Sequence, residues 1–557
     1  MLGLRKEQAR SVCPKTDCSR RRKTKHHWFT WMFPVGGALA LMWFLIRVIP
    51  KPSRATYPCQ RVAFPLASGF VIWLAGAVGS ITAIRRAKRS FAQSRYVLCV
   101  MLVAVSVGSL WLAQSMTAEK AVLADEPAAN APIGVAKGIH PGRVVWVHDP
   151  DATDWDGPGK GHWWESDHTN QAAVDQMMSR AIKALSGEQT SASAWDELFK
   201  HFNSTHGKGN VGYKPGEKIV VKVNYVGCIR IWSRRPATRI EDYNLGNSDY
   251  MNTSPQMIIA LLRQLVDEAG VNQANITVGD TLCYFPNEYY NMCHEQFPDV
   301  RYLEYLGKFG RTAAKSSSVA LYWSTPDAAG TKTDYVPESY AEADYLINLA
   351  NLKSHNDQAG ITLCAKNHYG SLVRKPARSP GHYDLHKDLP FNTPGMGHYR
   401  PLVDLMGHKH LGGKTLLYLI DGLYAGKHAK ERAPRKWNSE PFNGHWSSSL
   451  FASQDPVAID SVGFDFLRTE WDDAPHRSGT NDYLIEAALA DNPPSGTFYD
   501  PDHKGNVARL ASLGAYEHWN SPADKQYSRN LGTGKGIELV KLRGGSSTRA
   551  AVAFSNR

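Results

Sequence analysis

The chain has 557 residues, of which 64 are Lys or Arg and 52 are Asp or Glu, and its apolar fraction is 43%. The length exceeds that of one ordinary domain, and the composition supplies enough apolar residues for a large core. The basic excess lies entirely in residues 1–117, because residues 118–557 hold 46 basic and 50 acidic residues. Binding to nucleic acid depends on neutralising its phosphates, so we exclude nucleic acid as a partner.

Three apolar runs precede this larger part, at about residues 28–46, 62–84 and 96–117. Each is close to the ~20 residues that a helix needs to cross a membrane, so we expect three transmembrane helices over 28–117 and the lipid bilayer as a partner. Lys and Arg crowd residues 1–27 and the loop after the second run, and such flanks stay in the cytoplasm. The sequence therefore predicts a multi-pass protein with a basic cytoplasmic tail and an extracytoplasmic soluble domain. The alternative is an export signal that is cleaved after the third run, near Val122-Leu123-Ala124.

Residues 118–140 are rich in Ala and Pro and predict a linker. Between residues 141 and 545, strand-like and helix-like segments alternate, which predicts an α/β fold with a mainly parallel sheet and helices on both faces. Helices are expected at 171–186, after a cap at Thr253 or Ser254, and from Asp455-Pro456 to about Glu470. Strands are expected at 144–148, 218–224, 276–279, 345–349 and 416–420. Residues 546–557 are predicted to form a disordered tail.

Polar side chains stand at the carboxyl ends of several expected strands, where parallel sheets bind their ligands. Lysine binds carboxylate or phosphate, Asn and His orient a ligand, and Gly permits a close approach of the backbone. We predict substrate binding by Lys222, Asn224, Asn367 and Gly370, and catalytic roles for Lys353, His355, Lys366 and His368. The alternative is that Lys222 and Lys353 are exposed strand-end residues without a particular role.

A divalent metal ion is a candidate cofactor, because imidazole and carboxylate groups are common metal ligands. We predict its ligands among Asp421, Asp455, His408 and His410. The structural alternatives are that Asp421 is a turn residue, that Asp455 caps a helix, and that the histidines are solvated loop residues. A dense acidic loop over residues 149–156 suits Ca²⁺, although Asp is also common in turns.

Five sequence blocks, taken in order, resemble the domain-of-unknown-function 362 family over about residues 215–470. They are Lys222-Val-Asn224 with the capped helix and Val278-Gly279-Asp280, then Ala343 to His355, Cys364 to Leu372, Leu419-Ile-Asp421-Gly422, and Ala452 to Asp460. The resemblance implies an α/β fold but no established reaction.

Many relatives of this kind carry closely spaced cysteines for iron–sulfur clusters. The soluble part of this chain has four scattered cysteines, Cys228, Cys283, Cys293 and Cys364, so we expect no intrinsic cluster. Cys283 and Cys293 are close enough in sequence to form a disulfide, and the alternative is that all four are small buried side chains.

Two functional hypotheses follow from these observations. The first is an enzyme that binds a small anionic substrate, with assistance from a metal. The second is a non-catalytic protein that binds a metal, a cofactor or an envelope polymer.

Overall fold

The computed structural model describes residues 81–93, 127–228, 237–325, 332–356, 358–374, 382–505 and 509–544, with scattered positions between residues 39 and 104. The chain divides into two compact units, Met1–Glu119 and Lys120–Arg557. The predicted tails at 1–27 and 546–557 lie outside the described residues.

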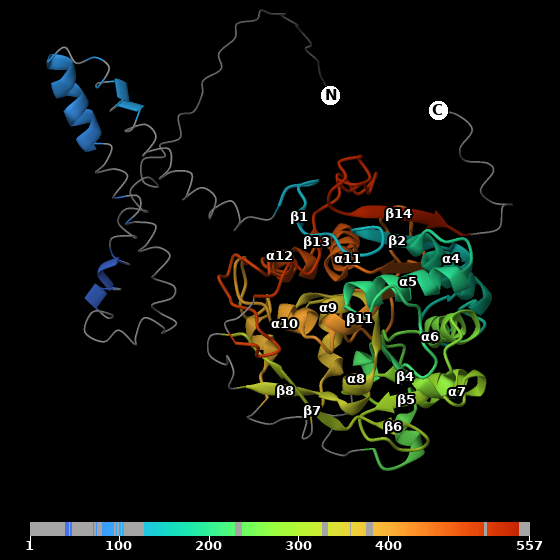
Figure 1. Cartoon of the computed structure of the whole chain (residues 1–557). Helices are drawn as coiled ribbons and strands as arrows, with labels where there is room; N and C mark the ends of the chain where they lie inside the picture. The colour runs from blue at the N-terminus through green and yellow to red at the C-terminus, as the bar shows by residue number, and fades with distance from the viewer. Residues whose placement is uncertain are drawn as a thin grey trace, which may run out of the picture. The chain divides into compact units, whose positions relative to one another are not determined.

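The second unit is built around a ten-stranded sheet (Figure 1). Its strands are β2 (Arg143–His148), β3 (Ile219–Lys222), β4 (Ile276–Gly279), β5 (Arg301–Glu304), β6 (Thr312–Ala313), β9 (Tyr345–His355), β10 (Gly360–Thr362), β11 (Thr415–Gly426), β12 (Ser449–Ser453) and β14 (Glu538–Arg543). Two smaller sheets pair β1 (Ile133–Gly134) with β13 (Ala515–Tyr516) and β7 (Ser316–Tyr322) with β8 (Thr333–Pro337). Strand β1 lies within the predicted linker, so that part of the linker belongs to the fold.

The strand order is β14-β2-β12-β11-β9-β3-β4-β5-β6, with β10 paired to β9 beside this path. Strand β12 is antiparallel to both neighbours, and the other eight strands of the path run in one direction. The carboxyl ends of β3, β4, β9 and β11 therefore meet at one edge of the sheet. Strand β12 ends at the opposite edge, because Ser453 pairs with Tyr418 near the start of β11.

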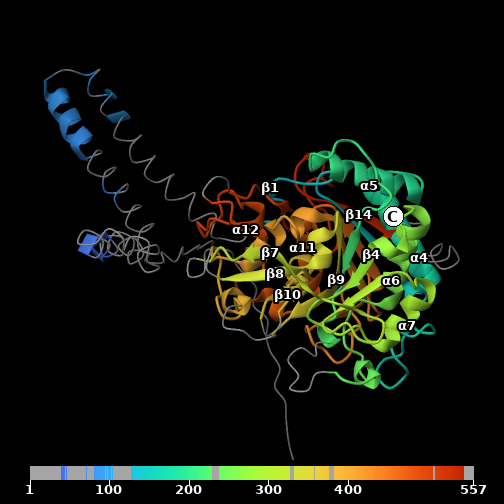
Figure 2. The same cartoon turned by 60° about the horizontal axis from the view of Figure 1, so that its bottom comes forward.

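Helices cover both faces of the sheet, and the views in Figures 1 and 2 agree on their grouping. Side chains along β2 alternate between two hydrophobic cores, with Val144 and Trp146 in one and Val145 and Val147 in the other. This period of two is expected of a strand that is buried on both faces. One core contains residues of α4 (Gln171–Ser186), α5 (Ser191–Thr205), α6 (Pro255–Arg263) and α7 (Asn287–Gln296). The other contains residues of α8 (Glu338–Glu342), α9 (Cys364–Asn367), α10 (Pro401–Gly407), α11 (Pro456–Glu470) and α12 (Asp482–Ala488).

The predicted helices are confirmed where local signals were strongest. Helix α4 has the predicted bounds, and Ser254 caps α6 by accepting a hydrogen bond from the Met257 amide. Asp455 caps α11, whose first residue is Pro456, as expected of a proline at the first helical position. All five predicted strands are present, but β9 and β11 continue further than their apolar runs.

The structure contradicts the prediction of three transmembrane helices. In the described part of the chain, none of the helices combines the length and the apolar character that a membrane crossing requires. Residues 81–92 are helical and carry Arg85, Arg86, Lys88 and Arg89. Most of the three apolar runs lies outside the described residues. The predicted multi-pass membrane location is corrected by the same finding.

Candidate functional site

A small cavity of about 60 Å³ lies beside residues from the carboxyl edge of the sheet. Asn224 follows β3, Asp280 follows β4, and His355 ends β9. Lys366 and Asn367 come from the short helix α9, which follows β10. These five residues line the cavity, and four of them are predicted site residues.

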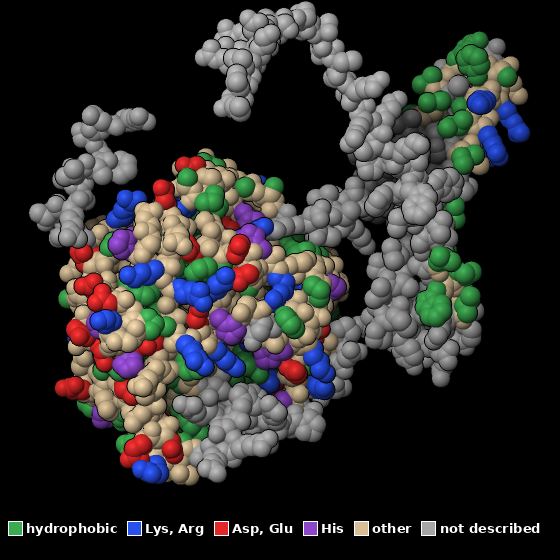
Figure 3. All heavy atoms as spheres, turned by 180° about the vertical axis from the view of Figure 1, so that it is seen from behind, with side chains coloured by type: hydrophobic (Ala, Val, Ile, Leu, Met, Phe, Trp, Pro, Cys, Tyr) green, Lys and Arg blue, Asp and Glu red, His purple; other side chains and the backbone are tan. Residues whose placement is uncertain are grey.

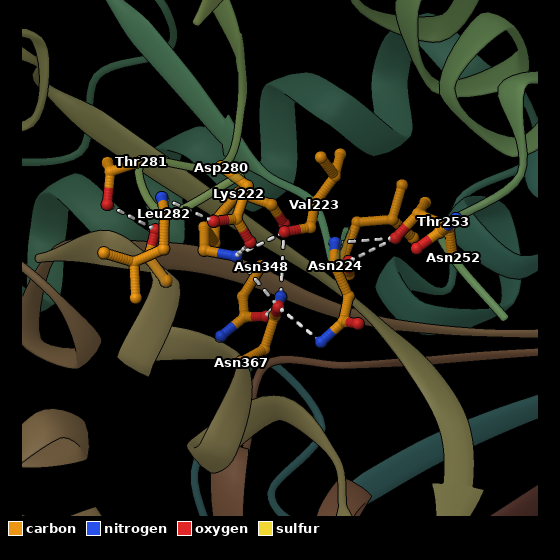
Figure 4. Close-up of polar contacts among 12 residues, drawn as sticks. Lys222, Val223, Asn224, Asn252, Thr253, Asp280, Thr281, Leu282, Asn348 and Asn367 are labelled. Atoms are coloured by element: carbon orange, nitrogen blue, oxygen red, sulfur yellow. Dashed lines mark hydrogen bonds and ion pairs between the residues drawn. The ribbon is translucent and has the colours of Figure 1, made fainter. Parts of the chain in front are cut away.

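Lys222 lies at the end of β3 and is completely buried. Its ammonium group donates to the carboxylate of Asp280 (Nζ to Oδ2, 2.8 Å), to the side-chain oxygen of Asn367 (3.0 Å) and to the carbonyl of Val223. Figure 4 shows Lys222 between Asp280 and Asn367. All three ammonium hydrogens are thereby used, which is what a buried cation requires to remain charged. Lys222 bonds to two residues of the cavity wall and is not itself among the residues that line it.

Lys353 lies in β9 and is also completely buried. Its Nζ donates to Asn224 Oδ1 and to the Met251 carbonyl, both at 2.9 Å. Burial lowers the pKa of Lys353 to about 7, because removing an ammonium group from water disfavours its charged form. Its side chain therefore changes charge near neutral pH while it holds a residue of the cavity wall.

Asparagine side chains connect the two buried lysines. Asn224 donates to Asn367 (Nδ2 to Oδ1, 3.2 Å), and Asn367 donates to Asn348 (Nδ2 to Oδ1, 2.8 Å). Lys353 therefore reaches Lys222 through two amides that line the cavity. Figure 4 shows the part of this chain formed by Asn224, Asn367 and Lys222. Such a network fixes the orientation of each amide, because exchanging its oxygen and nitrogen would break these bonds.

Gly370 permits the close packing of this network. A Cβ atom at Gly370 would lie 2.5 Å from Asp280 Oδ2 and 2.8 Å from Lys222 Cε. Both neighbours are buried partners of one ion pair, so neither can move cheaply. Gly370 is thus required by the Lys222–Asp280 contact, and its predicted place at the site is explained by packing.

The remaining predicted catalytic residues differ in their surroundings. Lys366 lies with its Nζ 4.4 Å from the centre of the Tyr369 ring, and both residues line the cavity. The ring of His355 lies 6.3 Å from that of His428. His368 is fully buried away from the cavity wall, and burial lowers its pKa to about 3. His368 is therefore neutral at physiological pH.

Several residues of the cavity wall are not among those predicted from the sequence. Asp280 was noticed only within a family block, although its position directly after a strand is the same signal that selected Lys222. Thr362, Cys283 and Tyr369 also line the cavity. Burial raises the pKa of the Cys283 thiol well above its usual value, which keeps it protonated. Cys228, Cys283, Cys293 and Cys364 are buried and form no disulfide among the described residues, so the considered Cys283–Cys293 disulfide is absent there.

The structure does not bring the four predicted metal ligands together. Asp421 lies within β11 and accepts from the Ser254 and Leu423 amides, while burial raises its pKa to about 6. His408 contacts the Ala320 carbonyl through Nε2 (3.1 Å), and its Nδ1 accepts from the His410 amide.

Asp455 lies beyond the end of β12, at the opposite edge of the sheet from the cavity. Its Oδ1 accepts from Val457 and Ala458, and its Oδ2 accepts from Lys137 and Ala515. The fourth predicted ligand, His410, contacts Lys414 Nζ through Nδ1 at 2.9 Å. Within the described residues, the cavity wall holds no group of three His, Cys, Asp or Glu side chains close enough to share one ion.

Residues 240–465 match the family model described as "Domain of unknown function (DUF362)". This match supports the assignment of a DUF362 domain to residues 240–465. It includes the cavity residues Asp280, His355, Lys366 and Asn367, whereas Lys222 and Asn224 precede it. No curated protein and no solved structure matches the chain. Because the DUF362 description gives no reaction, function has to be argued from the site itself.

Proposed function

We propose that the cavity binds a small anionic molecule and that the protein is an enzyme acting on it. The observation that carries this proposal is that Lys366 lines the cavity, while the buried ammonium groups of Lys222 and Lys353 bond to wall residues behind it. The wall holds one carboxylate, that of Asp280. Asp280 offsets one positive charge, so the surroundings of the cavity keep an excess of positive charge. Lys222, Lys353 and Asp280 are buried, and electrostatic attraction between buried groups and an anion is weakly screened.

The cavity residues divide into two proposed roles. Lys366 and His355 line the cavity and would contact the anion, while the amides of Asn224 and Asn367 would orient it. Lys353 would act through Asn224, because its own hydrogen bonds go to the protein. An anion beside Lys353 favours the charged ammonium form, so ligand binding near pH 7 should be accompanied by proton uptake.

A non-catalytic binding protein is the second candidate. It is favoured by Lys222, whose three hydrogens are all used within the protein and which therefore has none to give to a reacting group. Mass spectrometry of small molecules that co-purify with the chain, before and after incubation, separates the two candidates. A chemical change in the bound molecule would indicate an enzyme, and an unchanged molecule would indicate a carrier.

The binding proposal is tested by titrating the protein with phosphate, sulfate and malonate while measuring melting temperature and binding heat. Lys366→Ala and His355→Ala should each abolish stabilisation by the anion without lowering the melting temperature of the free protein. Lys218→Ala is the matched control, because Lys218 precedes the same strand β3 at its other end and pairs with exposed Glu342. The proposal fails if none of the three anions stabilises the protein, or if Lys218→Ala loses the effect equally.

A further inference from the structure

The loop between β2 and α4 carries a second group of polar side chains, separate from the cavity. Thr153 and Thr169 form a β-bridge that closes this loop, and the Asp154 amide donates to the His168 carbonyl (2.8 Å). The hydroxyl of Tyr424 in β11 donates to the same carbonyl at 2.7 Å. Trp155 and Trp163 are almost completely buried beneath the loop. The backbone of His168 is therefore held in place by the core of the domain.

Glu165, Asp167 and His168 lie together on this loop, and each offers one ligand atom within 4.8 Å of the other two. His168 Nε2 lies 3.9 Å from Asp167 Oδ2. Two ligand atoms that share one tetrahedral zinc ion are roughly 3.4 Å apart, given metal–ligand bonds of about 2.1 Å. The three atoms therefore need only small side-chain adjustments to reach the same ion.

The hydrogen bonding of His168 leaves the correct nitrogen available for a metal. Its Nδ1 lies 3.3 Å from the Asp154 carbonyl, and a carbonyl can only accept, so Nδ1 carries the hydrogen. In the neutral ring the lone pair is then on Nε2, which lies 3.9 Å from Asp167 Oδ2. Metal-binding histidines commonly donate their other N–H to a backbone carbonyl in this way.

Gly161 keeps the space between the ligand atoms open. A Cβ atom at Gly161 would lie 2.5 Å from Glu165 Oε2 and 2.8 Å from His168 Nε2, so any side chain would occupy the region between them. Gly159 is different, because it has a similar positive φ but no neighbour within 4 Å of an added Cβ. The loop thus contains one glycine that faces the ligand atoms and one that faces open space.

The two carboxylates have no Lys or Arg partner among the described residues. Glu165 accepts a hydrogen bond from the His162 amide, but in the described part of the chain neither Glu165 nor Asp167 pairs with Lys or Arg. Like charges held this close repel each other, and a bound cation would remove that repulsion.

We propose that Glu165, Asp167 and His168 bind a divalent transition-metal ion, with Gly161 providing the room for it. A ligand set of one imidazole nitrogen and two carboxylate oxygens fits Zn²⁺ better than Ca²⁺ or Mg²⁺, which prefer oxygen ligands alone. The side chain of Asp167 is 73% exposed, so the ion would keep a position open to water. This site does not depend on the anion cavity.

The test uses the full chain, freed of metal with a chelator and titrated with Zn²⁺ by calorimetry. Binding is also measured as metal retained through dialysis. Glu165→Gln and His168→Asn should each weaken Zn²⁺ binding by more than about tenfold, since even residues behind a metal ligand contribute 10–100-fold. Asp156→Asn removes an exposed charge from the same loop without removing a ligand, and it should leave the affinity unchanged. Ca²⁺ should bind more weakly than Zn²⁺.

Comparing Gly161→Ala with Gly159→Ala distinguishes a loss of space at the proposed site from a general effect of substitution on the loop. Gly161→Ala should weaken Zn²⁺ binding as strongly as loss of a ligand, whereas Gly159→Ala, with comparable backbone strain, should not. The absorption spectrum of the Co²⁺-substituted His168→Asn protein should differ from that of the native protein, and the spectrum of Asp156→Asn should be unchanged. Equal Zn²⁺ affinity in the native protein, Glu165→Gln and His168→Asn would overturn the proposal and leave only adventitious binding by other histidines. Equal loss in both glycine variants would overturn the role of Gly161.

Discussion

The two edges of the ten-stranded sheet bury charge in different ways. At the carboxyl edge, Lys222 and Lys353 bond to side chains that line a cavity. At the opposite edge, the two carboxylate oxygens of Asp455 accept hydrogen bonds from four backbone amides. Asp455 thereby caps α11 and holds the segments around Lys137 and Ala515 in place. Both sets of residues are polar, buried and next to strand ends. The two edges differ in that the buried lysines of the carboxyl edge adjoin a cavity, whereas the oxygens of Asp455 are occupied by backbone amides.

The largest expected effect tests the buried ion pair at the carboxyl edge. Lys222→Met leaves Asp280 buried without its cation, which should lower the free energy of unfolding by about 3–5 kcal/mol. Urea unfolding measures this change. The control is Lys218→Met, which breaks a half-exposed pair with Glu342 and should cost about 1 kcal/mol or less. Similar losses in both variants would mean that burial of the Lys222–Asp280 pair contributes nothing.

At the opposite edge, Asp455→Ala removes the acceptor of four amide hydrogens and should lower the free energy of unfolding by about 2–4 kcal/mol. The affinity of the cavity for an anion should stay unchanged, because Asp455 lies at the other end of the strands. Denaturation and anion titration of the same variant measure both quantities. A selective loss of anion affinity with normal stability would contradict the structural role of Asp455.

Gly370→Ala places a Cβ against the Lys222–Asp280 pair and should lower the free energy of unfolding by about 1–3 kcal/mol. It should also weaken anion binding, since the displaced Asp280 is part of the cavity wall. Chemical denaturation and calorimetry provide the two measurements. Gly463→Ala is a useful comparison, because its Cβ would meet only apolar Leu363 and Ile420 side chains, at 3.0–3.3 Å. It should leave the anion affinity intact.

The smallest effect concerns pH. The folded protein releases the Lys353 proton near its pKa of about 7, whereas the unfolded chain holds it up to the model-compound value of 10.5. Between these values the unfolded state binds more protons, so the free energy of unfolding should rise with pH by up to about 1.4 kcal/mol per pH unit. The rise should be smaller in Lys353→Met when urea unfolding is measured from pH 7 to 9. Identical slopes in both proteins would rule out the lowered pKa.

The sequence predicted those elements whose signals are local. The apolar period of residues 171–186 and the caps at Ser254 and Asp455 act within one or two helical turns, so their consequences do not depend on the rest of the fold. The apolar runs before residue 118 were read by the same local rule. There the length of the run was taken as the length of a helix, and the described helices do not support that step.

The sequence also placed Lys222, Lys353, His355 and Lys366 near one another, because parallel strands end at one edge of a sheet. What it could not supply was the direction of each strand. Strand β12 runs opposite to its neighbours, which carries Asp455 to the far edge, and β11 continues past Asp421, which becomes a buried partner of Ser254. Strand direction is decided by pairing between segments far apart in the chain, so only the tertiary structure separates these carboxylates from the cavity.

Sequence alone therefore determined the α/β class, the main helices and the lysines at the strand ends, since periodicity, caps and apolar runs are written in adjacent residues. Tertiary structure alone decided that Asp280 pairs with Lys222 and that two asparagines connect the buried lysines. The physical reason is that hydrogen bonds, ion pairs and metal ligation act over a few ångströms in space. They become visible only after the chain has brought distant residues together.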